Sequence, residues 1–135
     1  GGDNSEAYRG HFDSHFFTIV LPIKINDTLD EDIGELVAFP AARKDPSSEI
    51  KNIWQKITWK RYASKSGFEK FKIKKKYIKE TFTNYKPLIF LGRTTFHGNN
   101  IVQEAAGERL SFLCHYVDTS GSNGVGQIAR RIRNR

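Results

Sequence analysis

Residues 15–25 read HFFTIVLPIKI, and this stretch predicts the first β-strand of the chain. Aromatic and β-branched side chains dominate it, and these residue types fit a pleated sheet. Pro22 has no backbone N–H to donate, so it predicts either an edge position or a bulge. We expect the strand to cover residues 16–25.

Two stretches in the second half of the chain predict further strands. Residues 86–96 read KPLIFLGRTTF, and residues 109–117 read RLSFLCHYV. The polar segment HGNNIVQEAAGE that joins them is too long for a tight hairpin turn. We expect strands over residues 88–96 and 110–117 that pair with each other in the antiparallel sense.

A first helix is predicted over residues 29–38. Thr28 and Glu31 have the spacing of a capping box, in which two side chains satisfy free N–H groups of the first turn. Apolar residues then recur at helical spacing and make one face: Leu29, Ile33, Leu36 and Val37.

A second helix is predicted over residues 46–58. Asp45 is a suitable N-cap, and Pro46 suits the first helical position because its fixed φ matches the helix. The apolar residues of this segment fall on one face, and we expect Trp54 to pack in the core. They are Ile50, Ile53, Trp54 and Ile57.

The segment that follows, residues 60–80, reads KRYASKSGFEKFKIKKKYIKE and is dominated by cations. Spacings of three and four between apolar residues favour a helix that continues to Phe82. Lysines that alternate with apolar residues over residues 70–77 leave a strand as the alternative. In both cases the aromatic residues pack inward, and the lysines share a solvated face.

The predicted order is strand, helix, helix, helix, strand, strand. This order indicates a single α+β domain with a small, mainly antiparallel sheet packed against two or three helices. A chain of 135 residues has the usual length of one domain. We expect a flexible arm over residues 1–10, the domain over residues 11–118, and a tail over residues 119–135 that is first rich in Gly and Ser and then in Arg.

The net charge of +7 is unevenly distributed along the chain. Residues 1–50 carry four basic and ten acidic side chains, a sum of −6, whereas residues 51–135 carry eighteen and five, a sum of +13. Such asymmetry points to a polyanion, an acidic partner or an anionic surface. A single cysteine forms no internal disulfide, and no apolar run approaches the roughly 20 residues of a membrane span. We therefore expect an intracellular protein, cytoplasmic or nuclear, without a metal or another cofactor.

The basic half of the chain predicts a nucleic-acid-binding module, because lysine and arginine neutralise phosphates and release counterions. A solvated helix face is the simpler interpretation of the same charges. Trp59, Tyr62 and Tyr77 lie near cations and could stack on bases of RNA or DNA. The predicted phosphate contacts are Lys60, Arg61, Lys70, Lys72, Lys74, Lys76, Lys79, Arg130, Arg131, Arg133 and Arg135.

Two alternatives stay open. The first is a small, metal-independent ribonuclease in which His97 acts as acid or base, with Lys86, Arg93 or the tail arginines stabilising the transition state. The sequence HGNN at residues 97–100 also fits an ordinary turn. The second alternative is a protein–protein interaction domain of a larger assembly, whose basic face meets an acidic protein or an anionic membrane.

The remaining histidines give weaker signals. His11 and His15 lie four residues apart around Asp13, and on a helix they could share a metal ion. The segment looks extended, however, so we expect a surface role and no metal. His115 follows Cys114 on a predicted strand, where neighbours point to opposite faces, so we expect a core histidine rather than a Cys–His pair.

A last pattern resembles the Asp…Glu-x-Lys arrangement of metal-dependent nucleases. It consists of Glu49 and Lys51 with Asp30 or Asp32 upstream. That chemistry needs Glu and Lys on one side of a strand, whereas the capping signals place both at a helix start. We therefore interpret the pattern as coincidence.

Overall fold

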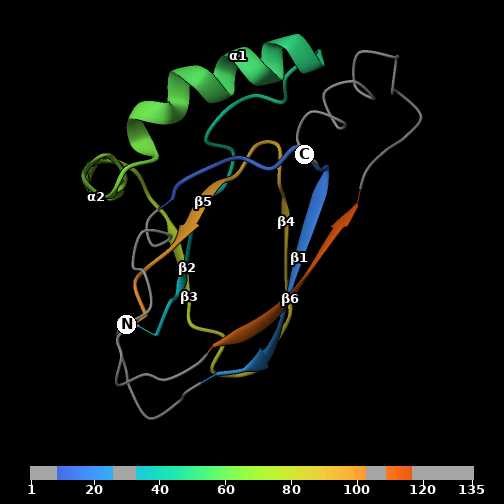
Figure 1. Ribbon diagram of the computed structural model, residues 1–135, viewed down its shortest axis with the longest axis vertical. Helices are drawn as coiled ribbons and strands as arrows, with labels where there is room; N and C mark the ends of the chain where they lie inside the picture. Colours follow the sequence, from blue (N-terminus) through green and yellow to red (C-terminus); the bar gives the residue numbers. More distant parts are fainter. Residues whose placement is uncertain (1–8, 26–32, 103–108, 117–135) are drawn as a thin grey trace, which may run out of the picture.

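The computed structural model describes residues 9–25, 33–102 and 109–116. Within these ranges the chain forms two three-stranded antiparallel sheets and two α-helices (Figure 1), which confirms a single α+β domain. The first sheet has the order β4-β1-β6, with bounds Leu88–Leu91, Phe17–Lys24 and Leu110–Tyr116. The second has the order β3-β2-β5, with bounds Ile78–Glu80, Leu36–Phe39 and Phe96–Asn99.

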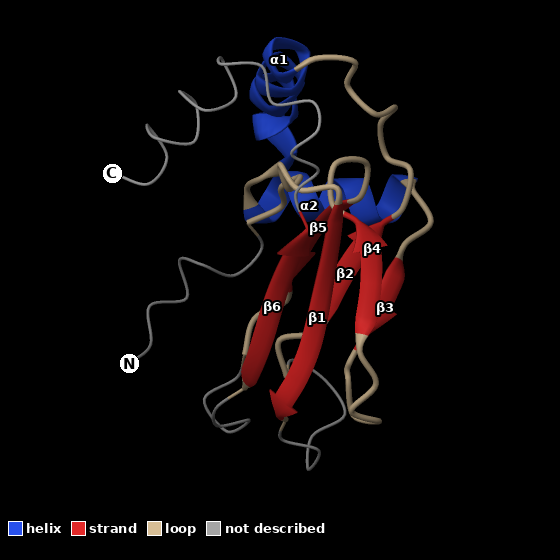
Figure 2. Cartoon of the chain, turned by 90° about the vertical axis from the view of Figure 1, so that its right-hand side faces the viewer, coloured by secondary structure: helices blue, strands red, loops and turns tan. Residues whose placement is uncertain are grey.

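The two sheets face each other, and both helices lie beyond one end of them (Figures 1 and 2). The helices are α1 (Glu49–Trp59) and α2 (Lys65–Lys74), joined by a short 3₁₀ helix η2 (Lys60–Tyr62). Neither helix is long and apolar enough to cross a membrane.

The predicted pairing of residues 88–96 with residues 110–117 is wrong. Strand β1 lies between β4 and β6, so that Thr18 faces Phe90 on one side and His115 on the other. The predicted strand also ends at Leu91, because a turn carries the chain from the first sheet into the second. In this turn Thr95 N donates a 3.0 Å hydrogen bond to Leu91 O.

Residues 96–99 form β5, although the polar connection was expected to begin at His97. The prediction of an edge position or a bulge at Pro22 is confirmed, because a register shift lies between Pro22 and Lys24 in the pairing with β6. Because β4 pairs with β1 only as far as Val20, the proline leaves no gap in that ladder.

The helix predicted over residues 29–38 is wrong as well. Leu36–Phe39 is strand β2, Gly34 has a φ of +78° that no helix accommodates, and residues 29–32 lie outside the described ranges. All four residues of β2 are buried because both faces of this strand meet apolar layers. A strand buried on both sides is continuously apolar, and over a short stretch this resembles a helix face.

The second predicted helix is confirmed as α1, although it begins at Glu49. Its N-cap is Ser48, whose hydroxyl accepts a 3.3 Å hydrogen bond from Lys51 N, and Asp45 instead accepts from Arg93 Nε at 2.8 Å. Glu49 and Lys51 therefore stand at a helix start, as expected. The lysine-rich segment divides into α2 and, after Lys74, the edge strand β3.

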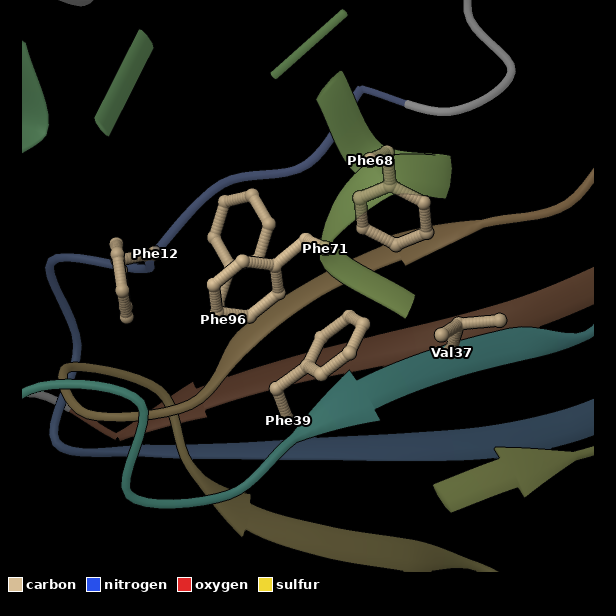
Figure 3. Close-up of a cluster of buried hydrophobic side chains, with 6 residues drawn as sticks. All are labelled: Phe12, Val37, Phe39, Phe68, Phe71 and Phe96. Atoms are coloured by element: carbon tan, nitrogen blue, oxygen red, sulfur yellow. The ribbon is translucent and has the colours of Figure 1, made fainter. Parts of the chain in front are cut away.

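An aromatic cluster fills the space between the second sheet and α2 (Figure 3). Phe39 makes edge contacts with Phe68 and Phe71 at ring distances of 5.7 and 4.7 Å. The aromatic cluster consists of Phe12, Val37, Phe39, Phe68, Phe71 and Phe96. A second apolar cluster includes residues of β1 and β2 and packs between the sheets.

Helix α1 contacts the domain through its polar side. Arg43 Nη2 donates a 2.7 Å hydrogen bond to Oδ1 of buried Asn52, and Arg43 Nη1 donates to Gln55 Oε1 at 3.2 Å. The expectation that Trp54 packs in the core is wrong, because its side chain is 69% exposed. The other members of the apolar stripe of α1 are exposed too: Ile50, Ile53 and Ile57.

Candidate functional site

A pocket of about 460 Å³ opens between the two sheets. Its walls come from the segment before β1 and from β1, β5 and β6, which are far apart in the sequence. The pocket gathers three of the four histidines of the chain with an acid, two arginines and two hydroxyl groups. These polar lining residues are Arg9, His11, Asp13, Thr18, His97, Arg109, Ser111 and His115.

Backbone hydrogen bonds place the segment before β1 across this pocket. His11 and His97 exchange two hydrogen bonds, with N···O distances of 2.9 and 3.0 Å, so the segment begins as a neighbour of β5. Asp13 N then donates to Gly92 O at 3.0 Å, at the end of β4. Asp13 therefore lies where the chain crosses from the second sheet to the first.

Both histidines turn the same ring nitrogen toward Asp13. His11 Nε2 lies 3.6 Å from Asp13 Oδ1, and His97 Nε2 lies 3.6 Å from Oδ2. The opposite nitrogens face carbonyl oxygens, with His11 Nδ1 2.8 Å from Arg9 O and His97 Nδ1 3.1 Å from Thr95 O. A carbonyl only accepts, so each Nδ1 carries the hydrogen.

Thr18 connects this group to the third histidine of the pocket. Its hydroxyl, which is buried, donates a hydrogen bond to Asp13 Oδ2. The Thr18 hydroxyl oxygen also lies 3.3 Å from His115 Nδ1 and can accept a hydrogen bond from it. His115 was expected in the core, but its side chain is exposed on the pocket wall and its ring stacks on His15 at 4.4 Å.

Burial and neighbouring groups shift the pKa values of His97, His11 and Asp13 by different amounts and in different directions. Burial lowers the pKa of His97 to about 4, although the Asp13 carboxylate opposes this. The hydrogen bond with Asp13 raises the pKa of His11, which is 56% exposed, against the effect of its own desolvation. Burial raises the pKa of Asp13, but the hydrogen bond to His11, the electrostatic interaction with the His97 ring and the Thr18 hydroxyl outweigh it and hold this pKa well below its usual value.

Arg109 supplies a fixed positive charge to the pocket. Its guanidinium lies 5.2 Å from the ring centre of Phe82 and forms no ion pair or hydrogen bond with any described residue. Burial lowers the pKa of Arg109, while the Glu35 carboxylate raises it, and an arginine stays charged under all such conditions. The pocket therefore suits an anionic ligand.

The predicted phosphate-binding residues fall into three groups. Lys72 is 18% exposed and lies 3.0 Å from Glu69, and Lys79 lies 2.9 Å from buried Glu35. Because α2 ends at Lys74, the helix that was expected to continue to Phe82 is wrong, and Lys72, Lys76 and Lys79 do not share a helix face. The exposed residues that form no ion pair within the described part of the chain are Lys60, Arg61, Lys70, Lys74 and Lys76. The tail arginines, 130, 131, 133 and 135, lie outside the described residues.

The aromatic residues near these lysines mostly pack inward. Trp59 contacts Phe12 edge-on at 4.9 Å, and Tyr62 packs on Phe71 at 5.0 Å. Tyr77 is 43% exposed and borders Phe39. Of the three stacking candidates, Tyr77 alone presents a large part of its ring to solvent.

Sequence reasoning found the histidines of the pocket but not their grouping. His15 does not join His11 around Asp13, and His97 takes that place from the opposite sheet. Lys86 and Arg93 do not line the pocket. Arg9, Thr18 and Arg109 carry no local signal, yet an antiparallel alignment of the strands near residues 18 and 115 would have brought Thr18 opposite His115.

Comparisons of the chain with protein-family models, with curated proteins and with solved structures found no match.

Proposed function

We propose that this protein binds nucleic acid through a basic surface on η2, α2 and the residues that follow. The observation that carries this proposal is that the cations of this surface are exposed and form no ion pair with a described residue. The neighbouring lysines Lys72 and Lys79, in contrast, are held in ion pairs. We define the basic surface as Lys60, Arg61, Lys70, Lys74, Lys75 and Lys76.

The chemistry of these residues favours phosphate contact without base readout. A lysine ammonium is a compact point charge on a flexible stem, so it follows a phosphate backbone but does not select a base edge. Each phosphate that is neutralised releases counterions, which makes binding depend strongly on salt. RNA and DNA are therefore both suitable ligands for this surface.

A charge-neutralised double variant, Lys74→Gln with Lys76→Gln, tests the proposal. Binding to short single- and double-stranded RNA and DNA is measured over a salt series by fluorescence anisotropy. We expect affinity at low salt to fall by about tenfold and the salt dependence to lose roughly two counterions. Folding is retained because both side chains are exposed.

The matched control is Lys44→Gln with Lys86→Gln, which removes the same charge from two exposed lysines outside the basic surface. An equal loss in both double variants would show a general charge effect and overturn the proposed surface. Unchanged binding in the first double variant would do the same. In that case the interaction-domain alternative would take first place, and the exposed apolar stripe of α1 is the surface it would use.

The ribonuclease alternative gains one geometric observation. His97 shares its pocket with two further histidines and with Arg109, whereas Lys86 and Arg93, which the sequence suggested, do not line it. One histidine could take the proton of the 2′-hydroxyl group while another protonates the leaving oxygen, and Arg109 would face the developing charge on phosphorus. Cleavage of RNA but not DNA in the presence of EDTA, lost in His97→Asn, is the result expected of this alternative.

A further inference from the structure

We propose that His11, Asp13 and His97 form a binding site for a divalent first-row transition metal, with Zn²⁺ the best fit. This inference is independent of the basic surface and of nucleic-acid binding. It rests on the geometry of three side chains that come from the segment before β1 and from β5.

The first argument is the distance between the candidate ligand atoms. The three side chains offer one ligand atom each, and these atoms all lie within 4.8 Å of one another. Ligands that bind Zn²⁺ at about 2.0–2.2 Å in a tetrahedral site are roughly 3.3–3.6 Å apart. Each histidine Nε2 is already 3.6 Å from an Asp13 oxygen, so the site closes on an ion by small side-chain rotations.

The second argument is the orientation of the lone pairs. Because Nδ1 of each histidine donates to a backbone carbonyl, a neutral ring directs its Nε2 lone pair at the Asp13 carboxylate, and a ring that is protonated at Nε2 releases this proton when the metal binds. Lone pairs that face carboxylate oxygens need a positive charge between them. One divalent ion supplies that charge for both rings, and metal-binding histidines are typically held by such Nδ1–H···O=C hydrogen bonds.

The third argument is the support around the carboxylate. Thr18 Oγ1 donates to Asp13 Oδ2, which restricts the rotation of this carboxylate. Hydrogen-bonded partners of this kind orient the ligands in metal sites. All three candidate ligands therefore have a second contact that fixes them.

The ligand types select the metal. Two imidazoles and one carboxylate suit Zn²⁺ and neighbouring transition ions, whereas Mg²⁺ and Ca²⁺ prefer oxygen ligands alone. Three protein ligands leave coordination positions open toward the pocket, as in catalytic rather than structural zinc sites. Arg109 lines the same pocket, so the chemical class expected in an open position is a small oxyanion such as phosphate or a carboxylate.

The test is zinc binding by the untagged full chain after removal of metal with a chelator. Competition with a chromophoric chelator gives the affinity, and Co²⁺ gives visible absorption bands that report the coordination geometry. We expect one ion per chain, intense bands of a four- or five-coordinate site, and a Tm that rises with Zn²⁺ because the ion binds the folded state.

Variants then assign the ligands. We expect His11→Ala and Asp13→Asn to weaken Zn²⁺ binding by more than about 100-fold, and Thr18→Val to weaken it by about 10–100-fold. His11 is largely exposed, so its replacement leaves the fold intact, which circular dichroism verifies. His15→Ala is the matched control, because it removes a histidine of the same segment that neither lines the pocket nor belongs to the three ligands.

Two results would overturn the proposal. One is the absence of stoichiometric Zn²⁺ or Co²⁺ binding by the folded wild-type chain, which would mean that protons alone occupy the space between the rings and the carboxylate. The other is equal affinity in His11→Ala and His15→Ala. Binding of Zn²⁺ with unchanged affinity for RNA and DNA would support the metal site and leave the nucleic-acid proposal to its own test.

Discussion

Lys79 Nζ lies 2.9 Å from Oε1 of Glu35, whose side chain is completely buried. Lys79 lies on the edge strand β3, and Glu35 precedes the central strand β2 of the same sheet. The other carboxylate oxygen of Glu35 accepts a hydrogen bond from Asn100 Nδ2 at 3.2 Å. A lysine that sequence analysis assigned to phosphate binding is therefore the ion-pair partner of a buried carboxylate in the second sheet.

Replacing this lysine should destabilise the protein. Lys79→Met leaves the buried Glu35 carboxylate without its cation, which costs about 2–3 kcal/mol in the free energy of unfolding at neutral pH. Urea unfolding measures this loss. The control is Lys70→Met, an exposed lysine of α2, for which we expect a change within about 0.5 kcal/mol. Equal effects of the two replacements would contradict a structural role for Lys79.

The same carboxylate makes stability depend on pH. Burial raises the pKa of Glu35, but hydrogen bonds from Lys79, from its own backbone N–H and from Asn100 outweigh it, so the pKa is lower in the folded than in the unfolded chain. This contribution to stability is fully present above the unfolded pKa, near 4.5, and is lost as the pH falls through the folded pKa.

We therefore expect the urea midpoint to fall as the pH is lowered from about 5 toward 3. In Glu35→Gln this part of the pH dependence should be reduced, and the variant should be less stable than wild type at pH 7. The other charged group that Glu35 influences is Arg109, which stays protonated throughout this range. An unchanged pH profile in Glu35→Gln would rule out the carboxylate as its source.

Sequence reasoning found strands where alternation or β-branched residues gave a local signal, and it failed where burial on both sides removed that signal. Strand β1 was predicted nearly to its ends, and α1 within a few residues. Strand β2 was mistaken for a helix because Leu36 faces the cluster between the sheets while Val37 and Phe39 face the aromatic cluster. A short, wholly apolar stretch has no period that separates the two structures.

The candidate site was beyond local reasoning for a different reason. His11 and His97 are neighbours only because the segment before β1 pairs with β5, a contact between residues 86 positions apart. Asp13 joins them because the chain crosses there from one sheet to the other. No residue spacing within either segment predicts this grouping. It follows from which strands pair with each other, and local sequence patterns do not determine that pairing.

Helix α1 offers a direct comparison of its two faces. Asn52 is buried and accepts a 2.7 Å hydrogen bond from Arg43, whereas Trp54 is 69% exposed. We expect Asn52→Ala to cost about 1–3 kcal/mol because it removes a hydrogen bond to the charged guanidinium of buried Arg43. Trp54→Ala should change stability by less than about 0.5 kcal/mol. Chemical denaturation of both variants decides the point, and a larger loss for Trp54→Ala would place the apolar stripe of α1 in the core after all.

Gly92 provides the last prediction, because it lies directly behind the candidate metal ligands. A Cβ atom at this position would lie 2.7 Å from Asp13 Cβ and 2.9 Å from Thr18 Oγ1. Gly92→Ala must therefore displace the Asp13 side chain or the strand that carries Thr18. We expect a loss of about 1–3 kcal/mol in stability, and Zn²⁺ binding weakened by at least about tenfold in the fraction that stays folded.

A second glycine separates these two effects. At Gly67 in α2 an added Cβ would collide with Arg61 O and lie 2.9 Å from Tyr62 Cα, and neither of these residues lines the pocket. Gly67→Ala should therefore lower stability without weakening the binding of Zn²⁺ by the folded protein. Stability comes from urea unfolding without metal, and affinity comes from chelator competition at a temperature where both variants are folded. If the two glycine variants bind Zn²⁺ equally well, the position of Asp13 does not control the site, and the assignment of this carboxylate as a ligand is wrong.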